Sequence, residues 1–574
     1  MNYLRSLLKL YSFLSIRRKR QIYILIILLS IYSLLELLSI GSFIPLLATL
    51  VSVKQGSFNL PYPFNYFSEI LDPDSFLILI TFIFLSITLI SASIRVFTAK
   101  KQWTLTYQIT ADISQIMFSK IINQGYDFFL KSKTVNITSS VNNNLRLLTG
   151  STLIPIFNIV GAILVSLLLV LGLFLINASF GLLTLTIVAL AYYFFLLSNK
   201  KSLKKNSQIV VDSDEKRQKI LSESIGSIRD IIIDSSQEVY NAEFSENDSL
   251  YWKATSRSMF LGSYPRFILE GLSLSCFCIF SYLITSNSSS TTSIPAIGSF
   301  ALAANKLLPA AQLIFFSISQ MRFSAKAVQQ VLELVEMPKV NIKKNCKKRD
   351  FHLLKLSHVD YSYPGQEHIK TLKDISLELR LGESLGIIGP SGSGKSTLLD
   401  LMLGLTLPNS GLITIDGLKI NKDNVPAWRK CIAHVPQNIF LCNTTIAENI
   451  AFGEKKENID YDYLEEVIKL SSMDSFINNK DGIFQKIGEN GINLSGGQRQ
   501  RIGIARALYK RAKFIFLDEA TSALDEQTEL EIMTSMYNLI RNEGISMVAI
   551  SHKKSVLSKC SKIYKIVRGE LIEI

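Results

Sequence analysis

The chain has 574 residues and a mass of 64.4 kDa, with a mean hydropathy of +0.27 and 19% charged residues, against roughly 25% in an ordinary soluble protein. Its apolar residues gather in a few long runs, which excludes a single soluble globule. The net charge of +14 would suggest a nucleic-acid partner for a soluble chain. In a membrane protein the same excess is explained by Lys and Arg in cytoplasmic loops, so no nucleic-acid partner is expected.

Six apolar stretches in the first half are long enough to cross about 30 Å of hydrocarbon as helices, which takes roughly 20 residues each. They are residues 22–50, 76–94, 152–176, 178–198, 267–285 and 293–317. A secretory signal peptide is the alternative for the first stretch, but that stretch is too long and no small-residue cleavage site follows it. The sequence therefore predicts a multi-pass α-helical membrane domain with six transmembrane helices.

Basic residues lie on alternate sides of these stretches. Residues 17–20 read RRKR before the first stretch, and Lys and Arg recur in the connections after the second and fourth, whereas residues 51–75 contain only Lys54. The positive-inside rule then predicts a multi-pass protein of the cell inner (cytoplasmic) membrane with both termini in the cytoplasm. The two basic connections read as helices that extend the membrane helices into the cytoplasm, with tips near residues 124–134 and 229–240.

The composition changes again near residue 350. Residues 338–350 read PKVNIKKNCKKRD, which is typical of a solvated linker. From Phe351 onward, short β-branched runs alternate with helical patterns, as in an α/β domain. We place the transmembrane domain at residues 1–325, the linker at 326–350 and the α/β domain at 351–574.

A glycine-rich segment lies between the apolar run 384–388 and a helical pattern that opens at Thr397. In this context it predicts a phosphate-binding loop for ATP and Mg²⁺, in which backbone N–H groups approach the phosphates. Lys395 would reach the β and γ oxygens, and the Ser396 hydroxyl would bind Mg²⁺. The segment consists of Gly389, Pro390, Ser391, Gly392, Ser393, Gly394, Lys395 and Ser396.

Two carboxylates end the apolar run 514–517. Asp518 is placed for a second Mg²⁺ contact, and Glu519 is placed to polarise the attacking water. The alternative is that the two acids only cap the next helix. The phosphate loop upstream favours the catalytic interpretation.

A second phosphate-receptive segment, Ser495, Gly496, Gly497 and Gln498, precedes the helical run 502–509. Its glycines and its serine at a helix N-terminus offer free N–H groups and a favourable dipole to an anion. One domain thus carries two phosphate-binding surfaces.

These motifs, in this order, resemble the ATP-binding cassette family, and specifically its half-transporter exporters. The resemblance implies that the segment at 494–498 is the family signature, which closes over ATP held by the phosphate loop of a second, identical copy. It implies that Tyr363 stacks on adenine, that Gln437 joins Mg²⁺ to the membrane interface, and that His552 is the switch histidine contacting the γ-phosphate. Asp525 matches the loop that connects the two ATP sites. This sequence departs from the family's pattern at Asn490 and at Lys553-Lys554, where arginine and Arg-Leu are frequent.

Short stretches in the first half and after the phosphate loop are similar to the lipid-linked oligosaccharide flippase of bacterial protein N-glycosylation. They are residues 35–45, 265–271, 305–309 and 400–405. The resemblance implies ATP-driven export or flipping of an amphipathic substrate, such as a lipid-linked oligosaccharide or other glycolipid. The alternatives are a drug, lipid or peptide exporter, and a nucleotide-gated channel or regulator without pumping. Glu519 argues against the last, since a pure switch need not hydrolyse ATP quickly.

Ionisable residues inside the membrane usually face a cavity or a partner, because their burial is costly. Lys306 is therefore a candidate for substrate contact, and the alternative is a pair with Glu270 or Glu36 that holds helices together. Arg95 and Arg266 lie nearer the cytoplasmic ends, where they either contact substrate or extend to lipid headgroups. Membrane lipids are thus expected partners of the first half.

Overall fold

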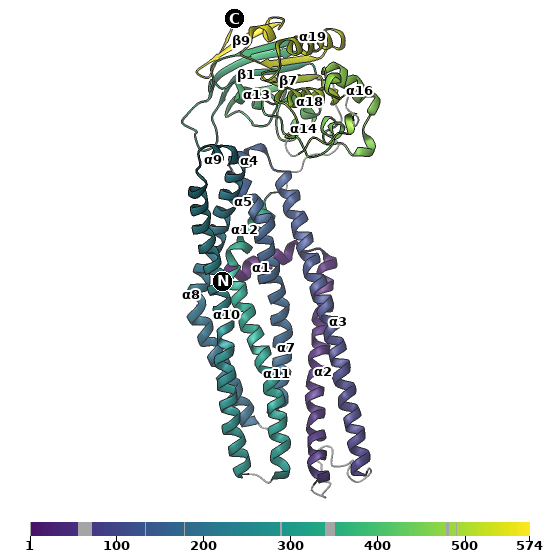
Figure 1. Cartoon of the computed structure of the whole chain (residues 1–574), viewed down its shortest axis with the longest axis vertical. Helices are drawn as coiled ribbons and strands as arrows, with labels where there is room; N and C mark the ends of the chain where they lie inside the picture. The colour runs from purple at the N-terminus through teal and green to yellow at the C-terminus, as the bar shows by residue number, and fades with distance from the viewer. Residues whose placement is uncertain are drawn as a thin grey trace. The chain divides into compact units, whose positions relative to one another are not determined.

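The computed structural model describes residues 2–54, 72–131, 134–176, 178–287, 290–338, 351–477, 482–488 and 491–574. The chain divides into two compact units, shown in Figure 1. The first comprises Met1–Ile122 and Ser132–Lys339, and the second comprises Asn123–Lys131 and Val340–Ile574.

Helices form the described part of the first unit (Figure 1). They are α1 (Asn2–Phe13), α2 (Ile16–Lys54), α3 (Pro73–Ile122), α5 (Thr134–Ser139), α6 (Leu145–Leu148), α7 (Ile154–Ile176), α8 (Ala178–Gly226), α9 (Ile228–Ile233), α10 (Gln237–Asn287), α11 (Ser290–Phe323) and α12 (Ala325–Glu336), with π-helical turns η2 (Ser140–Asn144) and η3 (Thr149–Leu153). Helix α3 has 50 residues and α10 has 51, so each is about 75 Å long at 1.5 Å per residue. Both exceed the roughly 30 Å of hydrocarbon by more than twofold, as the predicted cytoplasmic extensions require.

Each of the six predicted membrane stretches lies in one of the long helices α2, α3, η3 with α7, α8, α10 and α11. Within the residues that the structure describes, three segments are long and apolar enough to cross a membrane: Ile16–Leu50, Asp74–Ile122 and Ile137–Gly172. Helices α8, α10 and α11 include side chains that the structure does not describe. The predicted helical membrane domain followed by an α/β domain is confirmed.

Helix α12 occupies residues 325–336, which the sequence assigned to the linker from residue 326 onward. One face of α12, with Val328, Val331 and Val335, is fully buried in a cluster that includes Ile113 and Met117 of α3. The predicted linker therefore begins with a packed helix, because its apolar residues recur at helical spacing. Residues 339–350 of that linker lie outside the described part.

The second unit contains two β-sheets (Figure 1). An antiparallel sheet has the order β2 (Leu372–Arg380), β1 (Leu353–Tyr361), β4 (Ser410–Ile415), β5 (Leu418–Lys419). A second sheet has the order β10 (Glu570–Glu573), β9 (Lys562–Val567), β3 (Ser384–Ile388), β8 (Ser546–Ile550), β7 (Phe514–Asp518), β6 (Ile432–Val435), and its pairs are parallel except for β9 with β10. The carboxyl ends of parallel strands are where ligands bind in such sheets, and β3 and β7 end there at the phosphate loop and at Asp518.

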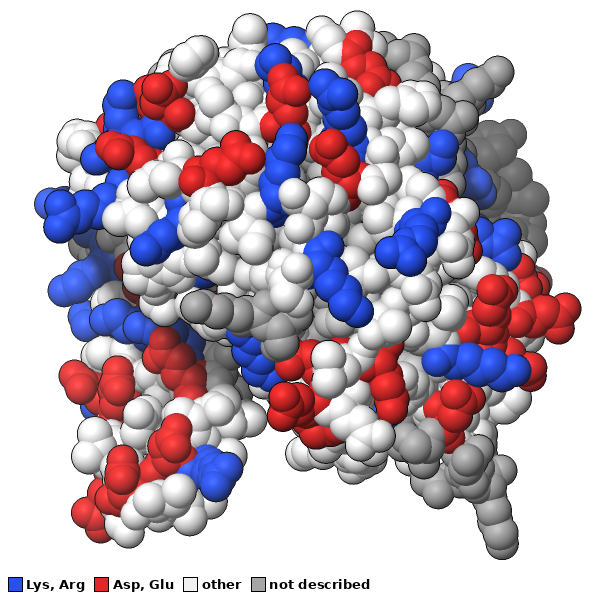
Figure 2. All heavy atoms as spheres, turned by 90° about the horizontal axis from the view of Figure 1, so that it is seen from above, with Lys and Arg blue, Asp and Glu red and all other residues white. Residues whose placement is uncertain are grey.

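The second unit also contains helices and 3₁₀ turns. They are α4 (Tyr126–Lys131), α13 (Lys395–Met402), α14 (Val425–Cys431), α15 (Ile446–Ile450), α16 (Tyr461–Leu470), α17 (Asp474–Ile477), α18 (Gly496–Tyr509), α19 (Glu526–Glu543) and α20 (Lys554–Leu557), with 3₁₀ turns η4 (Lys456–Asn458) and η5 (Gly482–Phe484). Two apolar clusters form the core, one centred on Trp428 and Phe516 and the other on Ile502 and Ile515. Figure 2 shows Lys and Arg interspersed with Asp and Glu over the visible face, so the excess positive charge forms no single patch there.

The half-buried His434 of β6 gives a test of this fold. Its Nε2 atom is buried without a hydrogen-bond partner, and burial lowers its pKa from 6.5 to about 4. Between these pH values the unfolded chain binds more protons than the folded chain. The contribution of neutral His434 to the free energy of unfolding is therefore complete above pH 6.5 and is lost as the pH falls to 4. The loss is up to about 3 kcal/mol at 1.36 kcal/mol per pKa unit. We expect the thermal unfolding midpoint of the second unit, measured in the full chain, to fall less on acidification in His434→Leu; an identical fall would contradict this role.

Candidate functional site

The predicted phosphate loop connects β3 to α13 and requires its glycines. Gly394 has a φ of +107°, and a Cβ there would lie 2.8 Å from Leu372 Cδ2. A Cβ on Gly389 would lie 2.6 Å from the Ile566 carbonyl oxygen. A side chain at either position would collide with its surroundings, so the loop keeps its backbone N–H groups accessible.

Polar groups of this loop are arranged to receive an anion. Lys395 Nζ donates to the carbonyl oxygens of Gly389 at 2.8 Å and Pro390 at 3.0 Å, which holds the ammonium inside the loop. Ser393 Oγ is buried and has no hydrogen-bond partner within the protein. Buried polar atoms without partners are rare in proteins, and a phosphate oxygen would satisfy this one, so the loop fits the nucleotide that its sequence predicts. The Tyr363 hydroxyl lies 2.9 Å from Thr397 Oγ1 and places its ring beside the loop.

Oxygen ligands suited to Mg²⁺ lie at the ends of two elements. Ser396 Oγ of α13 donates to Asp518 Oδ2 of β7 at 3.4 Å. Burial raises the pKa of Asp518, and the hydrogen bond from Ser396 opposes this shift. Burial, with a smaller contribution from Asp518, raises the pKa of Asp400 to about 6. Hydroxyl and carboxylate oxygens are ligands that Mg²⁺ prefers, so the pair Ser396 and Asp518 fits the predicted metal.

Glu519 brings three predicted catalytic residues together. Gln437 Nε2 donates to Glu519 Oε2 at 2.7 Å, and His552 Nε2 lies 3.1 Å from Glu519 Oε1. Glu519 itself has a φ of +49°, a left-handed backbone that costs free energy and is frequent at functional sites. Gln437, Glu519 and His552 are far apart in the sequence. They meet because each follows one of the neighbouring strands β6, β7 and β8.

The signature segment packs against the loop that precedes α19. Ser495 caps α18 and forms a reciprocal capping box with Gln498. A Cβ on Gly496 would lie 3.3 Å from Ala523 Cβ, and one on Gly497 would lie 3.2 Å from the Ala523 carbonyl oxygen. Asp525 in turn accepts from the Thr528 N–H at 3.0 Å and caps α19. Asn490, the first departure from the family's pattern, lies outside the described residues.

The loop after α3 belongs to the second unit. It contains α4, whose Tyr126 has a pKa raised by burial and, to a smaller extent, by Asp400 and Tyr363. Of the predicted stalk tip at residues 124–134, residues 124–131 thus belong to the second unit, and Tyr126 lies near Asp400 and Tyr363. Asp400 had no predicted role, since a carboxylate one turn into a helix carries no distinctive sequence signal.

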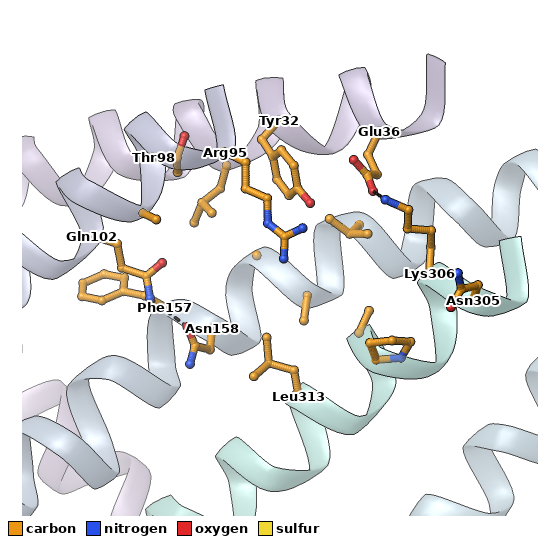
Figure 3. Close-up of a pocket in the computed structure, with 17 residues that line it drawn as sticks. Tyr32, Glu36, Arg95, Thr98, Gln102, Phe157, Asn158, Asn305, Lys306 and Leu313 are labelled. Carbon is orange, nitrogen blue, oxygen red and sulfur yellow. Dashed lines mark hydrogen bonds and ion pairs between the residues drawn. The ribbon is translucent and has the colours of Figure 1, made fainter. Parts of the chain in front are cut away.

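A cavity of about 470 Å³ lies between α2, α3, α7 and α11 of the first unit (Figure 3). The Arg95 guanidinium points into it, with its Cζ 5.8 Å from the centroid of the Tyr32 ring. Gln102 Nε2 donates to Asn158 Oδ1 at 2.8 Å at one end. In the described part of the chain no salt bridge to Arg95 is found.

Lys306 also lines this cavity, but its charge is balanced. Its Nζ donates to Glu36 Oε1 at 2.5 Å, and Ser91 Oγ donates to Glu36 Oε2 at 3.2 Å. Glu36 is only 5% exposed. Glu270 instead pairs with Arg266 one turn away on α10 at 2.5 Å. Of the two pairings considered from sequence, the structure has Lys306 with Glu36, and Arg266 is outside the described lining of the cavity.

Both units of the chain match models of known protein families. A family model described as "ABC transporter transmembrane region" matches residues 20–304, and one described as "ABC transporter" matches residues 372–522. The chain belongs to the ABC transporter family. It has the domain order of an ABC exporter half-transporter, and its second unit is the ABC ATPase domain.

Relatives of this ABC exporter match it over different lengths. A protein of Rickettsia bellii assigned to the export ATP-binding/permease class is 29% identical over 84% of this chain and 78% of its own length. An ATP-dependent lipid A-core flippase of Wigglesworthia glossinidia brevipalpis is 40% identical over 38% of this chain and 37% of its own length. Another such export protein, from Rickettsia typhi, is matched over 45% of its length, so the matched segment spans less than half of two of these relatives.

A solved structure shows the same fold. A bacterial Atm1-family ABC exporter with ATP bound has a TM-score of 0.79, with 20% identity over 97% of this chain and 94% of that chain. At this identity the likeness concerns the fold alone.

Proposed function

We propose that two copies of this exporter form an ATP-driven pump for an anionic amphipathic molecule. The substrate class is a glycolipid such as a lipid-linked oligosaccharide, moved outward across the cell inner membrane. The observation that carries the proposal is the cavity in the first unit, where Arg95 points inward without an ion partner among the described residues. A guanidinium that lines a cavity without an ion partner is suited to form charge-assisted hydrogen bonds with an anionic headgroup.

The polar groups of the cavity match a headgroup that carries both charge and hydroxyls. Arg95 supplies five donors in a planar fork suited to phosphate, and Gln102 with Asn158 offers amide groups to hydroxyls. Lys306 contributes less charge, because Glu36 already neutralises it. Arg266 is 48% exposed and paired with Glu270, so among the three candidate substrate residues it is the weakest.

The ATP cycle requires the second copy. The signature residues Ser495, Gly496, Gly497 and Gln498 would complete the ATP site of the partner subunit, with Asp525 between the two sites. Mg²⁺ would be held by Ser396, Asp518 and Gln437 and would neutralise charge on the β and γ phosphates. Glu519 would then orient and polarise the attacking water, and His552 would contact the γ-phosphate.

Opening and closing of this dimer would move the membrane helices. Helix α4 lies beside Asp400 and Tyr363, so a change at the nucleotide can reach the end of α3 through one short helix. We propose that both termini and the ATPase domain are cytoplasmic, because basic residues lie in the first turns of α2 and in the parts of α3 and α8 that follow the predicted membrane stretches.

Depletion of the protein in its own cells tests the proposed cargo. We expect a phosphate-bearing glycolipid to accumulate on the inner leaflet, detected by lipid analysis with leaflet-selective labelling. Unchanged lipid distribution, with accumulation of a neutral drug or a peptide instead, would overturn the glycolipid proposal and favour an exporter of that other class.

A further inference from the structure

A buried carboxylate in the ATPase domain lies outside the site described above. Glu529, one turn after Asp525 on α19, is only 3% exposed. Its Oε2 accepts from Lys553 Nζ at 2.9 Å, and its Oε1 is buried without a hydrogen-bond partner. A buried carboxylate depends on its ion partner, so Glu529 fixes the position of Lys553.

Lys553 directly follows His552. Beyond β8, the Ser551 N–H donates to the Ile387 carbonyl and the Lys553 N–H donates to Ser551 Oγ at 3.1 Å. The His552 side chain is 52% exposed, and its Nε2 lies 3.1 Å from Glu519 Oε1. The ion pair of Lys553 with Glu529 therefore directly connects the segment that contains His552 to α19.

Glu529 is also connected to the loop before α19. Asp525 caps the helix, and the Glu529 N–H donates to the Asp525 carbonyl at 2.9 Å. Ala523 in the same loop lies close to the signature glycines, since a Cβ added to Gly496 or Gly497 would come within 3.3 Å of it. A displacement of this loop would thus be passed through Glu529 and Lys553 to His552.

We propose that the Lys553 and Glu529 pair is a positioning device that sets His552 against Glu519 in response to the loop at residues 522–525. In this proposal Lys553 and Glu529 act through His552 and not through a contact with nucleotide or metal. The inference rests on the proposed ATP hydrolysis and is independent of the cargo.

Steady-state hydrolysis by the purified full-length exporter tests this inference. Lys553→Met is expected to lower kcat roughly tenfold, as for the loss of a coupling within the usual range, with little change in KM for ATP. Lys553→Arg restores the charge and should recover most of kcat. Glu531→Gln removes an exposed carboxylate from the same helix and serves as the matched control. If Lys553→Met lowers only the unfolding midpoint while kcat is retained, or if Lys553→Arg gives no recovery, the pair is merely structural and the inference is overturned.

A double-mutant cycle tests the path of action. In a His552→Ala background, measured by single-turnover hydrolysis, Lys553→Met should cause no further loss, because the residue acts through His552. Losses that multiply would overturn the inference. If Lys553→Met does not fold, Glu529→Gln takes its place, since it removes the charge and keeps the side-chain shape. Failure of Glu519→Gln to reduce hydrolysis would instead contradict the proposed ATP cycle itself.

Discussion

Glu519→Gln is expected to reduce ATP hydrolysis by roughly two to four orders of magnitude, the usual contribution of a positioned general base. The amide keeps the size of the side chain and its contact with Gln437, whose amide lies 2.7 Å away, but it cannot accept a proton from water. The phosphate loop is unchanged, so ATP binding should persist. Steady-state phosphate release and binding of a fluorescent ATP analogue measure the two quantities separately.

Glu526→Gln is the matched control for this change. Glu526 is an exposed carboxylate in the first turn of α19, seven residues after Glu519. Its replacement should leave ATP hydrolysis near the wild-type rate. If Glu519→Gln hydrolyses ATP within a few-fold of wild type, the water-activating role is wrong. The alternative in which Asp518 and Glu519 only cap a helix would then gain support.

Arg95→Gln is expected to weaken the response to an anionic lipid by roughly 10- to 100-fold in apparent affinity, the range for losing a hydrogen bond to a charged group. The assay is stimulation of ATP hydrolysis by a phosphate-bearing glycolipid in nanodiscs, with the unstimulated rate as reference. Lys306→Met should have a smaller effect on this affinity, since Glu36 already balances the Lys306 charge. This order differs from the sequence-based interpretation, in which Lys306 was the main candidate.

Lys100→Gln is the control for Arg95→Gln. Lys100 is an exposed cation on the same helix, outside the described lining of the cavity. Equal loss in Lys100→Gln and Arg95→Gln would indicate a general surface-charge effect and contradict a specific headgroup contact. A larger loss in Lys306→Met than in Arg95→Gln would show that the lipid displaces Glu36.

The sequence predicted those parts of the molecule that local patterns determine. The phosphate loop, Asp518 with Glu519, and the signature segment each combine a short motif with a strand or helix boundary, so both identity and local structure could be inferred. The long apolar runs predicted the membrane helices, because the length of such a run is also a local property of the sequence. Helix α12 lies within the predicted linker, where Val328, Val331 and Val335 carry a helical period that the sequence analysis did not use.

Contacts between distant segments could not be inferred in this way. Glu36 and Lys306 are 270 positions apart, and the sequence offered Glu270 as an equal partner. Arg95 was assigned to the membrane interface or to substrate, and only the packing of α2 against α3 shows that it points into a cavity beside Tyr32. The Lys553 and Glu529 pair depends in the same way on how α19 packs beside the end of β8.

Transport in proteoliposomes tests the central claim most directly. The measured quantity is the rate at which a fluorescently labelled anionic glycolipid crosses the bilayer, read with a quencher that reaches one leaflet only. The account predicts that crossing requires Mg²⁺ and ATP on the side of the ATPase domain and is lost in Glu519→Gln. Equal crossing rates without ATP, or in Glu519→Gln, would contradict it.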